Sequence, residues 1–155
     1  YLRFGRLAAP VFNDPSTYQF TIGKGITLRG GKDVTLIATG LMVSEALEAA
    51  EQLAEEGISA RVLNLHTIKP LDTDLICKAA AETGLLVTVE EHSIIGGLGS
   101  AVAETVCDCC PVPVVRIGVN DTYGHSGPAI DLLKEFGLCA SNIASVTKKA
   151  LAKKH

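Results

Sequence analysis

The sequence predicts an α/β protein built around a mostly parallel sheet that is covered by helices on both faces. From residue 33 onward, short apolar, β-branched runs alternate four times with helical patterns, and glycine or proline stands at most of the boundaries. With 155 residues, of which 47% are hydrophobic and 20% charged, the chain is long and apolar enough to bury one core. Right-handed βαβ crossovers then give a three-layer, Rossmann-like arrangement.

The first 32 residues do not share this alternation. Residues 1–6 form a short strand-like run, and the polar, proline-containing stretch that follows them indicates a linker. Residues 19–22 and 26–29 flank Gly23-Lys24-Gly25 and predict a hairpin or a bent pair of strands. We expect the second of these segments to lie antiparallel at an edge of the sheet.

The first strong unit is a strand followed by a helix. Residues 34–38 are typical of a strand that is buried on both faces. Ser44 is a suitable N-cap for the helix, Glu45 suits the positive end of its dipole, and Gly57 suits its C-terminal end. The apolar face of this helix is expected to consist of Ala46, Leu47, Ala50, Leu53 and Ala54.

The later units repeat this pattern. Asp72 or Thr73 can cap a helix that Gly84 stops, and Pro128 and Gly137 can open and close another. The remaining expected elements are strands over residues 60–65, 85–89 and 113–119 and helices over about 100–107 and 142–153.

The richest candidate for chemistry is the segment 90–99, which follows a predicted strand. Ligands gather at the carboxyl ends of parallel strands, and the N–H groups of Gly96, Gly97, Gly99 and Ser100 could hold an anion at the next helix. The favoured alternative is that Glu90 and Glu91 end the strand and the glycines permit a tight turn. Neither G-x-G-x-x-G nor G-x-x-x-x-G-K-[ST] occurs, so no nucleotide fingerprint supports the binding interpretation.

A second polar segment contains Asp121, His125 and Ser126 before Pro128. These residue types suggest a catalytic triad, but no G-x-S-x-G turn occurs, and small polar residues are ordinary at a helix start. His66 is expected to be a surface or hydrogen-bonded loop histidine. We therefore expect no catalytic residue in this chain.

The five cysteines do not show the spacing of a metal site. Cys107, Cys109 and Cys110 are crowded together, but a structural zinc site needs a second pair, and Cys77 and Cys139 stand alone. We predict that all five are reduced, small hydrophobic residues and that no metal is bound. The net charge of -3 disfavours nucleic acid as a partner, and no apolar run is long enough to cross a membrane. A cytoplasmic domain is the expectation.

Four strings, taken in order, resemble the C-terminal domain of transketolase. They are residues 31–40 with 43–46, residues 67–72, residues 89–92 with 96–99, and residues 127–129 with 132–138. The first three are shared with the β-subunit of 2-oxo-acid dehydrogenases and with deoxyxylulose-phosphate synthase. The last string is more like transketolase.

The resemblance implies a structural and dimer-assembly domain of an enzyme of the pentose phosphate pathway. That enzyme family uses thiamine diphosphate and a divalent metal to move a two-carbon ketol unit between sugar phosphates. Its cofactor lies between a diphosphate-binding and a pyrimidine-binding domain, in cis or in a second subunit, usually across a homodimer. The implied alternatives are a 2-oxo-acid dehydrogenase subunit that holds a partner subunit, and a deoxyxylulose-phosphate synthase.

The same resemblance implies a division of the chain. Residues 1–6 would be the remnant of a pyrimidine-binding domain, residues 7–32 a linker and edge strand, and residues 33–155 the C-terminal domain. Arg6 matches a family arginine that contacts the substrate phosphate in the full protein. The fragment itself would bind no cofactor and would not catalyse the reaction.

Overall fold

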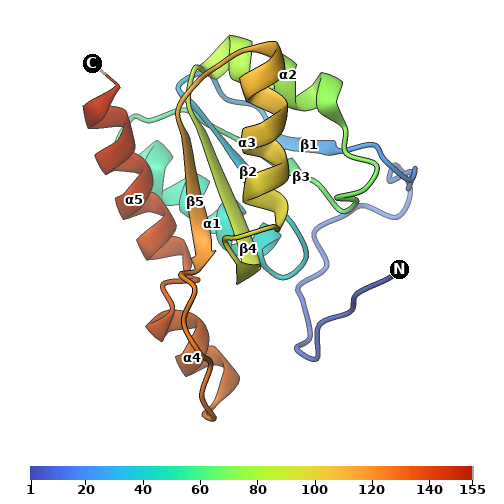
Figure 1. The fold of residues 1–155 in the computed structure, drawn as a ribbon, viewed down its shortest axis with the longest axis vertical. Coiled ribbons are helices and arrows are strands. Elements are labelled where there is room, and N and C mark those ends of the chain that lie inside the picture. The colour runs from blue at the N-terminus through green and yellow to red at the C-terminus, as the bar shows by residue number, and fades with distance from the viewer. Residues whose placement is uncertain (155) are drawn as a thin grey trace.

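The computed structural model describes residues 1–154, and its centre is a five-stranded sheet in the order β1-β3-β2-β4-β5 (Figure 1). The strands are β1 (Ile26–Arg29), β2 (Val34–Ala38), β3 (Ala60–Asn64), β4 (Leu86–Ser93) and β5 (Val114–Val119). Strands β2 to β5 pair in parallel, and β1 pairs antiparallel with β3 at the edge. The predicted mostly parallel sheet with an antiparallel edge strand is confirmed.

Helices cover both faces of this sheet. They are α1 (Met42–Glu55), α2 (Thr73–Thr83), α3 (Leu98–Cys109), α4 (Ala129–Glu135) and α5 (Ala140–Lys153). Helices α1 and α5 pack together on one face, and α2 and α3 pack together on the other. The short α4 extends beyond the arrowheads of β4 and β5 (Figure 1). The three-layer prediction is therefore confirmed.

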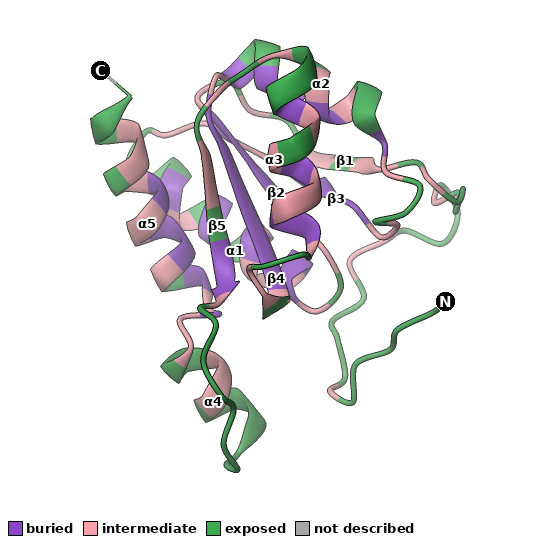
Figure 2. Ribbon diagram, viewed as in Figure 1, coloured by how far each residue is buried: buried purple, intermediate pink, exposed green. Residues whose placement is uncertain are grey.

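The core consists of two apolar clusters, one on each side of the sheet. Alternate residues of a strand point to opposite faces, so Leu36 of β2 packs under α1 and α5 while Ile37 packs under α2 and α3. Every residue of β2 is buried, as its apolar sequence predicts (Figure 2). The buried hydroxyl of Thr35 is 2.9 Å from that of Thr83, so its polarity is satisfied inside the core.

The start of α1 differs from the prediction. The helix begins at Met42, and the Ser44 hydroxyl lies inside its first turn, where it donates to the Leu41 carbonyl rather than capping the end. Glu45 is in the first turn as expected, but its carboxylate accepts from the Ala140 N–H at the start of α5, at 2.7 Å. The prediction of Ser44 as N-cap is wrong because the three residues before it already adopt the helical turn. Ala54, expected on the apolar face, is exposed.

The ends of α2 confirm the prediction. Asp72 is the N-cap, and its Oδ1 accepts from the Leu75 N–H at 3.3 Å. Gly84 ends the helix with φ +63°, a conformation that costs glycine little because it has no Cβ. Both ends of this helix were therefore readable from single residues.

The N-terminal segment forms less regular structure than expected. Residues 1–25 contain no strand, so the predicted hairpin with residues 19–22 is wrong, and the strand-like residues 1–6 are exposed coil. The reason is that β1 pairs with β3 and not with its own neighbour along the chain. The segment is fastened by Phe12 against the core and by a bond from Arg3 Nη2 to the Glu91 carbonyl at 3.1 Å.

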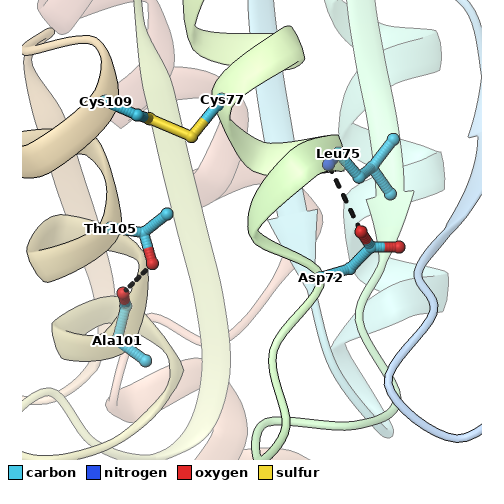
Figure 3. The surroundings of a disulfide bond; sticks show 6 residues. All are labelled: Asp72, Leu75, Cys77, Ala101, Thr105 and Cys109. Carbon is cyan, nitrogen blue, oxygen red and sulfur yellow. Dashed lines mark hydrogen bonds between the residues drawn. A yellow bond between two sulfur atoms is a disulfide. The ribbon is translucent and has the colours of Figure 1, made fainter.

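A disulfide joins Cys77 of α2 to Cys109 of α3, with the two Cα atoms 6.0 Å apart (Figure 3). The prediction that all five cysteines are reduced is therefore wrong for this pair, whereas Cys107, Cys110 and Cys139 are free thiols. The partners are 32 residues apart in sequence, and only the packing of α2 against α3 brings them together.

None of the described helices has the length and apolar character that crossing a bilayer requires.

Candidate functional site

The candidate site is the carboxyl edge of the sheet at the point where the strand order reverses. From β2 the chain passes to β3 on one side and later to β4 on the other, so the reversal lies beside β2. In sheets of this kind, ligands bind in the crevice outside the strand ends at such a point. The turn between β4 and α3 belongs to this edge.

The side-chain carboxylate of Glu90, a residue of β4, lies at the start of α3. Its side chain is only 2% exposed, and its Oε2 and Oε1 accept the N–H groups of Leu98 and Gly99, both at 2.8 Å. The N-terminus of a helix is a natural place for an anion because its first N–H groups lack intrahelical partners and its dipole is positive there. The anion held at this helix is thus a carboxylate of the same chain.

The glycines of this turn make room for that carboxylate. A Cβ on Gly97 would collide with Glu90 Oε2, and a Cβ on Gly99 would approach Thr88 Oγ1 to 2.7 Å. The Gly96 N–H donates to Ser100 Oγ at 2.9 Å, and that hydroxyl donates to the Ile94 carbonyl at 3.2 Å. The turn considered as a possible anion site therefore already has acceptors for the N–H groups of Gly96, Leu98 and Gly99. Binding of an external anion at Gly96, Gly97, Gly99 and Ser100 stays a prediction.

The role of Glu90 is a feature that sequence reasoning missed. The residue types that carry it were visible, since a glutamate precedes a glycine-rich turn and a helix. The expectation that Glu90 and Glu91 end the strand is wrong, because β4 continues to Ser93. What pattern alone could not show is that this carboxylate points to the helix start whereas that of Glu91 does not.

The residues that suggested a triad are not assembled. His125 Nε2 lies 3.0 Å from Glu135 Oε2, and its ring lies against Phe136 at 5.7 Å between centroids. Within residues 1–154, no hydrogen bond joins His125 to Asp121 or Ser126, and all three are exposed. Residues 121–127 form coil that leads to α4, whose N-cap is Pro128 and which has no side-chain cap.

His66 lies at the same edge and is a hydrogen-bonded loop residue, as expected. Its Nδ1 is 2.8 Å from Thr67 Oγ1, and its ring stacks on Phe20 with centroids 4.5 Å apart. Burial lowers the pKa of His66 below its ordinary value, and a backbone hydrogen bond with Lys24 opposes that effect in part.

Arg6 lies in the exposed N-terminal segment. It is Arg3, not Arg6, whose guanidinium bonds to the body of the domain. The implied contact of Arg6 with a substrate phosphate stays a prediction.

Two open hollows lie apart from Glu90. One, of about 420 Å³, is lined by the linker and β1, with Phe12, Tyr18 and Ile26 among its walls. The other, of about 470 Å³, lies between α1, α4 and the start of α5. Neither is lined by a residue that the sequence singled out as a binding candidate.

Comparison with known proteins decides the family. The model for "Transketolase, C-terminal domain" matches residues 23–143. The chain belongs to the transketolase C-terminal domain family. This confirms the resemblance that the four strings of the sequence predicted.

Relatives within this family include both transketolase subunits and synthases. Over all 155 residues the chain is 47% identical to a 6-deoxy-6-sulfo-D-fructose transketolase subunit of Clostridium sp. (strain MSTE9), and it spans 48% of that protein. It is 47% identical over 135 residues to a putative transketolase C-terminal section of Methanocaldococcus jannaschii, covering 86% of this chain and 42% of that one. A 1-deoxy-D-xylulose-5-phosphate synthase of Heliobacterium modesticaldum is 48% identical over 129 residues, which are 83% of this chain and 20% of the synthase.

Solved structures agree with the fold. A split-gene transketolase, described as an inactive β4 tetramer, superposes with a TM-score of 0.92 at 47% identity, covering 97% of this chain and 49% of that one. The transketolase of Leishmania mexicana, at 20% identity and a TM-score of 0.66 over 84% of this chain and 18% of that one, shows the same fold. The transketolase C-terminal domain described here spans about half the length of the transketolase subunits that it matches.

The described residues do not fit the cofactor that the family implies. Across residues 1–154, no three His, Cys, Asp or Glu side chains are grouped so that they could hold a metal ion. The helix start best suited to a diphosphate, that of α3, is filled by Glu90. The described residues therefore offer no grouped metal ligands, and a carboxylate already occupies the start of α3.

Proposed function

We propose that the chain is the C-terminal structural domain of a thiamine-diphosphate-dependent transketolase, which moves a two-carbon ketol unit between sugar phosphates. The observation that carries this proposal is the end-to-end match to transketolase subunits about twice as long. Besides the Clostridium protein, one of the subunits of an apulose-4-phosphate transketolase of Phocaeicola vulgatus is 42% identical over 153 residues, which are 99% of this chain and 49% of that protein. The remaining half of each of these relatives lies outside the part that matches the 155 residues.

The proposed role is support and assembly, not catalysis. At the edge where this type of sheet normally binds ligands, the first N–H groups of α3 already bond to the Glu90 carboxylate, which supports this role. The N-terminal segment, by contrast, exposes apolar side chains that a neighbouring domain or subunit would bury. They are Tyr1, Leu2, Phe4, Val11, Phe20 and Ile22.

The proposed partners are the diphosphate-binding and pyrimidine-binding domains, in cis or as a second subunit, in a cytoplasmic homodimer without nucleic acid or membrane. In this arrangement residues 1–6 belong to the pyrimidine-binding domain, 7–32 form the linker and edge strand, and 33–155 form the C-terminal domain. Arg6 reaches the substrate phosphate only in the full protein, where a guanidinium offers two parallel donors to phosphate oxygens.

A deoxyxylulose-phosphate synthase is the second candidate for the whole protein. It is favoured by the 48% identity to the Heliobacterium synthase. The third candidate, a 2-oxo-acid dehydrogenase subunit, rests on the three sequence strings that it shares with this chain.

A calorimetric titration tests the non-catalytic role. The 155-residue chain, titrated with thiamine diphosphate and Mg²⁺ up to millimolar concentration, is expected to give no saturable heat. The subunit encoded by the complete reading frame, produced together with any partner subunit, is expected to bind the cofactor. Saturable micromolar binding by the 155-residue chain alone would overturn the proposal.

Substrate assays on the complete protein separate the three enzymes. Transfer from a ketose phosphate to an aldose phosphate supports transketolase, and condensation of pyruvate with glyceraldehyde 3-phosphate supports the synthase. Capture of a lipoyl-carrying subunit supports the dehydrogenase. Either of the last two results, without ketol transfer, would replace the first candidate.

A further inference from the structure

The disulfide between α2 and α3 is a feature that the proposed function does not use. Cys109 is exposed and Cys77 is half-buried, so solvent reaches the sulfur of Cys109 more easily. It lies at the end of α3 opposite Glu90, and a helix of 12 residues separates these two ends by roughly 18 Å. Chemistry at the disulfide is therefore remote from the carboxyl edge.

The disulfide holds a turn that has little stability of its own. The last turn of α3 contains Asp108 and no basic residue, so its charge is unfavourable at the negative end of the helix dipole. The Cys110 N–H bonds to the Val106 carbonyl at 3.0 Å, but the next residue is Pro111, which has no N–H to offer. Cys109 belongs to this turn, and the disulfide fastens it to the middle of α2.

Two further thiols, those of Cys107 and Cys110, are close to Cys109 in the sequence, and they differ in how far they are buried. Cys110 is half-buried against the cluster under α2 and α3, whereas Cys107 is exposed. Residues two apart on a helix do not face each other, so Cys107 does not reach the disulfide while α3 is intact. Cys107 is therefore a natural control for Cys109.

We propose that Cys77 and Cys109 form a redox site, in which a dithiol reductant opens the disulfide and releases the last turn of α3 from α2. One thiolate of the reductant attacks the exposed Cys109 sulfur, a mixed disulfide forms, and Cys77 leaves as a thiolate that takes up a proton. The second thiol of the reductant then displaces Cys109, so two electrons pass to the protein and the reductant leaves as its own disulfide. In a reducing compartment, disulfides are usually transient or redox-sensing, and the exposure of Cys109 fits that class.

Thiol titration tests the first half of this proposal. The 155-residue chain, purified without reductant and titrated in denaturant, is expected to show the three free thiols, and all five after treatment with dithiothreitol. Five thiols without reductant, or three that remain three after dithiothreitol, would each overturn it.

Thermal unfolding and hydrogen exchange test the second half. Reduction is expected to lower the melting temperature by about 5–15 °C, because the closed loop no longer restricts the unfolded chain. It should also speed exchange of the Cys110 amide while leaving the Leu98 amide, bonded to Glu90, unchanged.

Serine variants of the cysteines are the controls. Cys107→Ser should respond to reductant like the parent chain, whereas Cys77→Ser and Cys109→Ser should not respond. A response that persists in Cys109→Ser, or an unchanged Cys110 amide, would contradict the proposal.

Discussion

At the residue scale, adjacent identical side chains have different roles because neighbouring residues of a strand point to opposite faces. Glu90 is buried and accepts two N–H groups of α3, while Glu91 is half-buried and contributes only its backbone carbonyl, to Arg3. A buried carboxylate is tolerated here because each of its oxygens receives a charge-assisted hydrogen bond. The N–H groups of Leu98 and Gly99 at the start of α3 depend on this one side chain for their acceptors.

Substitution of Glu90 tests that dependence. Glu90→Ala leaves two buried N–H groups without acceptors and a small cavity, so we expect the free energy of unfolding to fall by about 2–4 kcal/mol. Glu91→Ala, the matched control, should change it by less than about 0.5 kcal/mol. Urea unfolding of both variants measures the difference, and equal losses would show that Glu90 is not the anchor of the turn.

His66 gives the domain a dependence on pH. Because burial lowers the pKa of His66 in the folded state, the unfolded chain binds a proton more readily. Stability is therefore fully present above the unfolded value of about 6.5, falls as the pH drops through the lowered folded pKa, and then levels off.

A variant without a titratable side chain at position 66 tests this dependence of stability on pH. His66→Gln stays neutral at every pH, so its unfolding free energy should fall less than that of the parent chain between pH 7.5 and pH 5. Urea unfolding from pH 7.5 to pH 5 gives the unfolding free energy of each protein as a function of pH, and the value at pH 7.5 is the reference. Parallel curves would mean that His66 does not carry the effect.

At the scale of the element, helices and strands are where the sequence was most informative. Apolar periodicity and flanking glycines and prolines located the five helices of residues 1–154. Single residues such as Asp72 and Gly84 marked helix ends, because those ends depend on local chemistry. The hairpin at residues 19–29 failed because pairing between strands is decided by distant partners. Ser44 failed because a residue suited to a cap can also lie inside a first turn.

Asp72 links two elements as well as capping one. Its Oδ1 receives the Leu75 N–H at 3.3 Å, and its Oδ2 receives the Gly25 N–H at 2.9 Å, just before β1 (Figure 3 shows the first of these). We expect Asp72→Ala to lower the unfolding free energy by about 1–2 kcal/mol and Asp72→Asn to lower it less, because asparagine still caps. Asp74 is an exposed residue of the same first turn, and Asp74→Ala should lower the unfolding free energy less than either variant. Chemical denaturation ranks the three variants. A loss of unfolding free energy in Asp74→Ala equal to that in Asp72→Ala would refute the link.

At the scale of the whole molecule, the architecture could be predicted, whereas the contact of Glu90 with α3 and the disulfide could not. Alternating strands and helices leave few ways to build the sheet, so class, layers and the antiparallel edge followed from pattern. The bond from Glu90 to α3 and that from Cys77 to Cys109 depend on how crossovers place side chains 8 to 32 residues apart. The family resemblance added the expected enzyme, which no local pattern contained.

The two ends of the chain lie at opposite edges of the sheet. The first residues run past the carboxyl edge, where Arg3 meets Glu91, whereas Lys154 Nζ donates to the Thr83 carbonyl, beside the start of β4, at 2.6 Å (Figure 1). A label fused behind the last helix therefore projects away from the face at which the chain enters. A fluorophore or affinity tag placed there stands apart from the exposed apolar side chains of the N-terminal segment, which the proposed assembly would bury.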